Sequence, residues 1–135
     1  MIEFDDDDGI LRPIEVEEPA PRTLLVTVGG DLDGSTLTLL RLTLDEKLGD
    51  PRFARVVLDL SRVTSLPAPA VDLLRRLRRR CRVAHGHLVL VGTGHPAVHR
   101  PLRISGLLPL FDTRPTVGSA LPVPVTVGRA RSTSR

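Results

Sequence analysis

Two pairs of residues in this chain have types and spacings that chemistry could use. His95 and His99 lie four positions apart, a helical spacing that can bind a metal ion. No Glu follows His95 as a metalloprotease would need, so surface or capping histidines are the favoured interpretation. Thr64 and Ser65 carry hydroxyl groups that could accept a phosphoryl group, although short polar residues ahead of a helix are more often caps or turn formers.

Other candidate groups give weaker signals. The run Gly92-Thr93-Gly94 is not followed by the Gly-Lys-Ser/Thr of a phosphate-binding loop and fits a turn between a strand and a helix. Cys81 lies on an apolar helical stripe, which favours a small core residue over a nucleophile. No paired carboxylates and no nucleophile–base pair are expected to meet at one edge of the fold. The sequence therefore predicts a protein that is not an enzyme and that uses no metal and no cofactor.

Composition and charge limit the possible classes of protein. A chain of 135 residues with 41% hydrophobic residues is long enough for one domain with a real core, which must be aliphatic because only three aromatic residues occur. The chain contains neither an apolar run of membrane-spanning length nor a basic, apolar signal region, so a cytoplasmic protein is expected. Residues 1–18 carry a net charge of −7 and the remainder +10, and residues 1–10 are predicted to be an acidic disordered tail.

The most informative stretch is a predicted strand followed by a basic helix. Val56–Leu60 is apolar on both faces apart from Asp59, as expected of a strand that is covered on both sides. The helix that follows has one apolar stripe within about 100° on a helical wheel and arginines on the opposite side. The stripe consists of Ala70, Leu73, Leu74, Leu77, Cys81 and Ala84, and the opposite arginines are Arg75, Arg78, Arg79 and Arg82.

The other elements follow from hydrophobic periodicity and from turn residues. Strands are expected at 11–17, at 23–28 with an end at Gly29-Gly30, at 87–91 and at 108–112; helices are expected from Asp33 or Ser35 to about Leu48, from Pro96 to Gly106, and at 116–121. The order ββαβαβαβα predicts an α/β domain over residues 11–121, with a mixed, mostly parallel sheet of four to five strands and helices packed on it. Residues 122–135 are predicted to be a flexible tail.

Three segments in this order resemble the STAS domain of bacterial anti-sigma factor antagonists. Val28–Asp33 resembles the family's Gly-Glu-Leu-Asp turn after the second strand, and Val56–Val63 resembles its central strand and connector. His95–Leu102, with Ser105–Leu107, resembles its third helix and the Gly-Leu that closes that helix. The resemblance covers roughly residues 11–121 and implies the family's fold.

The resemblance also implies a partner and a regulatory site. Members of the family bind an anti-sigma factor that is a Ser/Thr kinase, and phosphorylation of an Asp-Ser-Ser-Gly or Asp-Ser-Thr-Gly loop breaks the complex. That motif falls on Pro67–Ala70, with Pro69 at the phosphoacceptor position, so the hydroxyl, the Asp and the Gly are all missing. Proline also removes one of the amides with which a helix N-terminus would bind an anion. The sequence therefore predicts a binding module without the usual phosphoryl switch.

Two alternatives to this function remain open. One is a scaffold subunit that assembles with other STAS proteins, and the other is nucleic-acid binding through the arginine-rich helix. The second is disfavoured because the domain has almost no aromatic residues on which bases could stack. Oligomers are possible, and no membrane partner is expected. The predicted partner-binding residues are Asp31, Asp33, Ser65, Leu66, Pro67, Ala68, Pro69 and Ala70.

Overall fold

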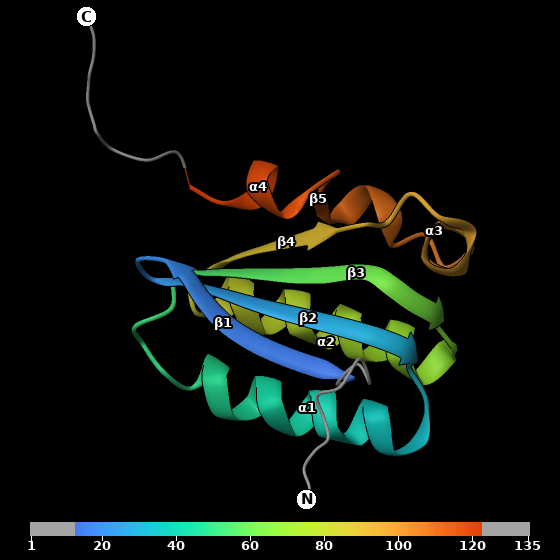
Figure 1. Cartoon of the computed structure of the whole chain (residues 1–135), viewed down its shortest axis with the longest axis horizontal. Helices are drawn as coiled ribbons and strands as arrows, with labels where there is room; N and C mark the ends of the chain where they lie inside the picture. The colour runs from blue at the N-terminus through green and yellow to red at the C-terminus, as the bar shows by residue number, and fades with distance from the viewer. Residues whose placement is uncertain (1–12, 123–135) are drawn as a thin grey trace, which may run out of the picture.

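A five-stranded sheet forms the centre of the structure, a computed structural model that describes residues 13–122 (Figure 1). The strands lie side by side in the order β1-β2-β3-β4-β5; β1 is antiparallel to β2, and the other neighbours are parallel. The elements are β1 (Ile14–Ala20), β2 (Thr23–Asp31), α1 (Gly34–Leu48), β3 (Arg55–Ser65), α2 (Ala68–Val83), β4 (His87–Val91), α3 (Pro96–Ile104), the 3-10 helix η2 (Leu108–Leu110), β5 (Asp112–Arg114) and α4 (Val117–Ala120). The predicted α/β class and element order are confirmed. The tails predicted at 1–10 and, beyond residue 122, at 122–135 lie outside the described residues.

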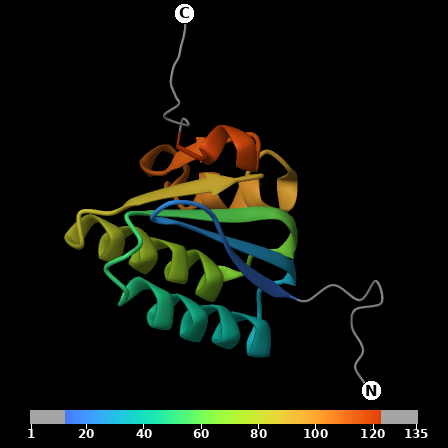
Figure 2. The same cartoon turned by 60° about the vertical axis from the view of Figure 1, so that its left-hand side comes forward.

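The two faces of the sheet are covered unequally. Helices α1, α2 and α3 pack on one face and enclose the larger core, whereas the short helix α4 lies over the other face (Figure 2). The larger core is aliphatic apart from Phe111, as the composition predicted. The smaller core contains Leu25, Val57, Val89, Val91 and Ala120. β3 and β4 are therefore buried on both sides, which explains why their sequences are apolar without alternation.

Helix α2 has the predicted amphipathic stripe, with differences near its ends. It begins at Ala68, and Pro67 is its N-cap residue. Val71 also belongs to the buried face, while Ala84 is exposed because the helix ends at Val83. The ion pair between Asp72 and the arginine one turn later is present, with 3.0 Å between the Asp72 Oδ2 and Arg76 Nη2 atoms.

Two strands are longer than predicted. β2 does not end at Gly29-Gly30 but continues to Asp31, and the ladder between β2 and β3 shifts register on both sides of the glycine pair. β3 continues past Leu60 to Ser65, so the segment expected to be a connector is strand. In that extension Val63 is buried and its neighbours are exposed or half-buried, a one-sided pattern that a search for apolar runs does not detect.

Smaller corrections concern the edges. β1 is shifted toward its C-terminal side, so that Pro19 lies inside this edge strand next to a register shift. The strand expected at 108–112 is instead η2 followed by β5, because Pro109 favours a helical turn there. Asp33 is the N-cap residue of α1, but its side chain makes no capping hydrogen bond. Pro96 is the first residue of α3 as predicted, and the helix ends two residues before Gly106.

Candidate functional site

The ends of β2 and β3 form one edge of the sheet and bring two distant segments together. Asp31 is the register partner of Ser65, and the backbone N–H of Leu32 donates to the Ser65 carbonyl at 3.0 Å. The Thr64 hydroxyl donates to the Asp31 Oδ1 atom at 2.6 Å, although both side chains are exposed. This bond holds the Asp31 carboxylate in place at the surface and uses the Thr64 hydroxyl as its donor.

The start of α2 stands at the same edge, directly after β3 (Figure 1). The Pro67 carbonyl accepts from the backbone N–H groups of Ala70 at 2.9 Å and Val71 at 3.1 Å. Pro69 has no N–H, so Ala68 carries the remaining amide of the first three helical residues. Because a helix N-terminus binds anions through several unpaired amides, this one is poorly equipped to hold a phosphoryl group.

The predicted site residues divide into a surface and its support. Ala68 and Pro69 are exposed at the helix start, and Asp31 and Asp33 are exposed on the β2–α1 side. Leu66 packs in the larger core together with Ala70, and these two side chains anchor the loop rather than offer contacts. Pro67 and Ser65 are half-buried between the two groups. The structure thus places all eight residues at one edge.

The edge also includes residues that the sequence reasoning missed. A hollow of about 370 Å³ lies between the start of α2 and the end of α3, beside Ala68. Ile104 of α3 is 75% exposed there, an unusual exposure for a large apolar side chain. On the other side, Thr38 and Arg41 of α1 lie close to Pro69. The sequence shows Ile104 only as one of the apolar residues of this helix, with Val98 and Leu102, and does not show that α3 ends beside α2 or that Ile104 is exposed there.

The two histidines do not form a metal site within residues 13–122. His95 is the N-cap residue of α3, and its Nε2 atom lies 3.1 Å from the Leu60 carbonyl oxygen, so the ring bridges α3 to β3. His99 is half-buried one turn later. The structure shows no group of three His, Cys, Asp or Glu side chains that could hold a metal ion in this part of the chain.

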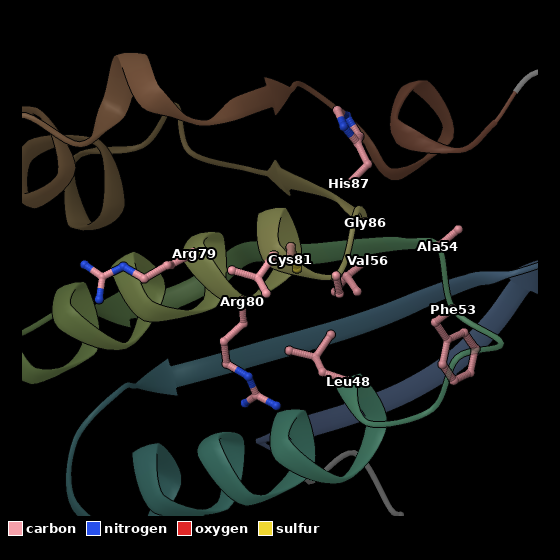
Figure 3. A pocket seen from close by; sticks show the side chains of 11 residues that line it. Leu48, Phe53, Ala54, Val56, Arg79, Arg80, Cys81, Gly86 and His87 are labelled. Carbon is pink, nitrogen blue, oxygen red and sulfur yellow. The ribbon is translucent and has the colours of Figure 1, made fainter.

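A second hollow, of about 340 Å³, lies at the opposite edge of the sheet, where the parallel strands begin (Figure 3). Leu48, Phe53 and Val56 line it, together with arginines of α2. Cys81 faces this hollow but is 4% exposed, and burial raises the pKa of its thiol. A neutral, buried thiol is a poor nucleophile, which agrees with the core role predicted for Cys81.

Comparison with known families identifies the domain. The model of the STAS domain family matches residues 14–120. The chain belongs to the STAS domain family. The match includes both strand ends, the α2 start and α3, so the whole edge described above lies inside the STAS domain.

Solved structures of anti-sigma factor antagonists resemble this chain over most of their length. An anti-sigma factor antagonist from Mycobacterium paratuberculosis is 27% identical, with a TM-score of 0.70 over 79% of this chain and 88% of the other. SpoIIAA in its unphosphorylated form is 19% identical, with a TM-score of 0.69 over 79% of this chain and 91% of the other. The phosphorylated form of the Bacillus cell fate determinant SpoIIAA is 18% identical, with a TM-score of 0.65 over 79% of this chain and 95% of the other.

Two further searches, one among curated proteins and one for membrane-spanning helices, give negative findings. A search of curated proteins finds no match to this chain. Among the helices of residues 13–122, none is both long and apolar enough to cross a membrane.

Proposed function

We propose that this protein is a regulatory binding protein of the anti-sigma factor antagonist type and is not phosphorylated at position 69. Its partner would be an anti-sigma factor of the Ser/Thr kinase class, bound at the edge formed by Asp31, Asp33 and residues 65–70. Membership of the STAS family and the likeness to an anti-sigma factor antagonist support the partner class. The observation that carries the proposal is Pro69 at the start of α2.

Pro69 removes both the hydroxyl that would be phosphorylated and one of the backbone amides that would bind the phosphoryl group. It has no hydroxyl that a kinase could modify, and its missing amide leaves Ala68 as the free donor among the first three helical residues. A family member such as SpoIIAA exists in a phosphorylated form, so the difference concerns regulation rather than fold. The complex formed by this chain would therefore not be broken by phosphorylation of the α2 start.

The same substitution favours binding by a rigid surface. Pro67 and Pro69 both have a fixed φ. The buried side chains of Leu66 and Ala70 anchor the two ends of this segment in the core. A loop that is already ordered loses less conformational entropy when a partner docks on it. We infer that, with the two prolines, the contact between the α2 start and the partner is permanent rather than controlled by phosphorylation.

A phosphorylation assay tests the proposal directly. The protein is incubated with its kinase-type anti-sigma factor and labelled ATP, and the label is mapped by mass spectrometry. We expect the complex to form while residues 64–70 stay unlabelled. The variant P67D/A68S/P69S/A70G, which restores the family's motif, serves as the positive control for the kinase. Label on Thr64 or Ser65 of the wild-type protein would refute the absence of a switch.

A binding measurement tests the partner and the edge. Asp31→Asn keeps an oxygen that can accept from Thr64 but removes the charge, and Glu46→Gln removes a charge from the outer face of α1. We expect the first change to weaken binding by about fivefold or more, as for a central interface residue, and the second to leave it unchanged. If affinity purification returned other STAS chains and no kinase-type anti-sigma factor, the scaffold alternative would replace this proposal.

A further inference from the structure

The positive charge of the described domain is concentrated on one helix. α2 contains six arginines and one aspartate, whereas the other residues between 13 and 122 include nine basic and ten acidic groups. Arg76 and Arg80 lie on the side of α2 that faces α1: Arg76 pairs with Asp72 one turn earlier on α2, and Arg80 pairs with Asp45 of α1. The excess charge therefore belongs to the other side of the helix.

That other side is the arginine face, which we define as Arg75, Arg78, Arg79 and Arg82. These four side chains surround an open hollow of about 380 Å³. Two of them are held in place: Arg75 pairs with Asp72 at 3.0 Å, and the Arg78 Nε–H donates to the Leu110 carbonyl at 3.0 Å. Arg79 and Arg82 are exposed and make no ion pair with any residue of the described part of the chain. Figure 3 shows Arg79 extending away from α1, in contrast to Arg80.

The chemistry of this face suits a run of carboxylates. Guanidinium groups bind carboxylates through paired N–H donors, and the four arginines span eight residues of helix, a rise of about 10 Å from the first to the last. The chain itself contains the run Asp5–Asp8. Four residues in an extended conformation span about 10 Å between their first and last Cα atoms, so the two rows of charge have matching lengths.

The four carboxylates of the run cannot all lie along the arginine face of their own chain at once. Pro13, the first described residue, lies beside β2, where its carbonyl accepts from the Gly29 N–H at 2.9 Å. The Cα atom of Asp8, five residues earlier, lies at most about 18 Å from that of Pro13, whereas the Cα atom of Asp5, eight residues earlier, can lie up to about 29 Å away. The arginine face lies on the η2 side of α2, whereas β1 packs beside α1 on the other side of that helix, so α2 stands between Pro13 and the face and the short tether of Asp8 limits the full run.

We propose that Asp5–Asp8 of one copy binds the arginine face of a second copy, so that two chains associate reciprocally. Nucleic acid is the other polyanion that such a face could bind, but the described aromatic residues offer it no stacking platform. Phe111 is buried. The Phe53 ring is covered by the Arg52 guanidinium, whose Cζ atom lies 5.2 Å from the ring centre. The self-association does not require the anti-sigma factor, because Arg79 and Arg82 lie away from the residue 65–70 edge; of the arginine face, Arg75 alone also lines the hollow beside Ala68.

Sedimentation of the full chain at two ionic strengths tests the association. Because exposed ion pairs are individually weak, the protein is measured on the order of 100 µM. We expect a dimer whose dissociation constant rises at least about tenfold between about 50 mM and about 500 mM NaCl, since salt screens exposed charges. R79E/R82E should be monomeric, while R100Q/R103Q, which removes two exposed arginines of α3, should dimerise like the wild type.

A charge exchange separates this contact from a general loss of stability. D5K/D6K/D7K/D8K should also be monomeric, but mixing it with R79E/R82E should restore a dimer, because each lysine run meets a glutamate face and each aspartate run an arginine face. Circular dichroism confirms that both variants are folded. A wild-type monomer at low salt, a dimer insensitive to salt, or variants that fail to complement each other would overturn the proposal. Binding of a double-stranded DNA oligonucleotide by a wild-type monomer would overturn it in favour of nucleic acid.

Discussion

Gly92 is the described glycine at which an added side chain would meet the closest obstruction. It follows β4 with φ at +77°, and a Cβ atom added there would lie 2.6 Å from the Cα and N atoms of Ser61. The obstructing atoms are backbone, so a side chain cannot be accommodated by a rotamer change. The close approach is what allows the turn after β4 to pass beside β3 and place α3 at the functional edge.

We therefore predict that Gly92→Ala lowers the free energy of unfolding by about 2–4 kcal/mol, since it adds strain at positive φ to a backbone clash. Gly94→Ala is the matched control: a Cβ atom there meets nothing within 4 Å, and its effect should stay below about 1 kcal/mol. Urea unfolding followed by circular dichroism measures both. Equal effects of the two substitutions would contradict the proposed steric cause.

Residue types in the site were predictable from the sequence, but their pairing was not. The absence of a hydroxyl at Pro69 follows from the aligned motif alone. The bond from Thr64 to Asp31 joins residues 33 positions apart and depends on the β2–β3 register, which shifts at the glycines. No local pattern encodes such a shift. For the same reason, the sequence alone suggests Thr64 as a phosphorylation site or a helix cap. In the structure its hydroxyl instead donates a hydrogen bond to the Asp31 carboxylate.

At the scale of elements, the types and order were predictable and the strand ends were not. The glycine pair in β2 indicated a strand end, since glycine commonly marks turns. In the structure the pair marks irregular pairing inside the strand: Gly30 has φ at +77° and the register shifts on both sides. Glycine has this second role at β-bulges, and a single sequence does not distinguish the two. The extension matters because it carries Asp31 to the functional edge.

The attachment of β5 to the sheet should depend on pH. It has three residues, and its Asp112 accepts from the Arg114 Nε–H at 2.9 Å and contacts the His87 Nε2 atom at 2.7 Å. The hydrogen bond from Arg114 lowers the pKa of Asp112 below its ordinary value of 3.8, and His87 lowers it further. A carboxyl group whose pKa is lower in the folded state stabilises the fold above the unfolded-state pKa, and that contribution is lost as the pH falls through the folded-state pKa.

We predict that Asp112→Asn destabilises the protein by about 1 kcal/mol at pH 7, a value limited by the solvent exposure of the pair. The difference from the wild type should persist down to about pH 4 and shrink below it, where the wild-type carboxyl becomes protonated. Thermal unfolding at a series of pH values measures the difference. A difference that grew on acidification would have the wrong sign for a lowered pKa and would contradict the assignment.

At the scale of the whole molecule, the distribution of charge was visible in the sequence but its consequence was not. The acidic residues before position 19 and the arginines of α2 could be counted directly. Whether they meet within one chain depends on where β1 starts and on which side of α2 the arginines stand. The packing of α2 between α1 and α3 places the arginine face on the η2 side of that helix, away from α1 and β1.

The packing also predicts which part of the chain folds by itself. The large core lies between the sheet and α1–α3, and the first and last long-range backbone contacts of the described residues are made by the Pro13 and Ala120 carbonyls, which accept from Gly29 and Arg55. A fragment of residues 13–122 keeps all of these contacts. We predict that its free energy of unfolding in urea, at about 500 mM NaCl to suppress association, agrees with that of the full chain within about 0.5 kcal/mol.

The same fragment lacks Asp5–Asp8 and should therefore be monomeric at low ionic strength, although its arginine face is intact. Its affinity for the anti-sigma factor should equal that of the full chain, because the residue 65–70 edge is complete. Sedimentation and a binding isotherm on one preparation measure both quantities. A fragment that unfolds much more easily would show that residues outside 13–122 contribute to the core, and one that still dimerises would place the contact between copies elsewhere on the domain.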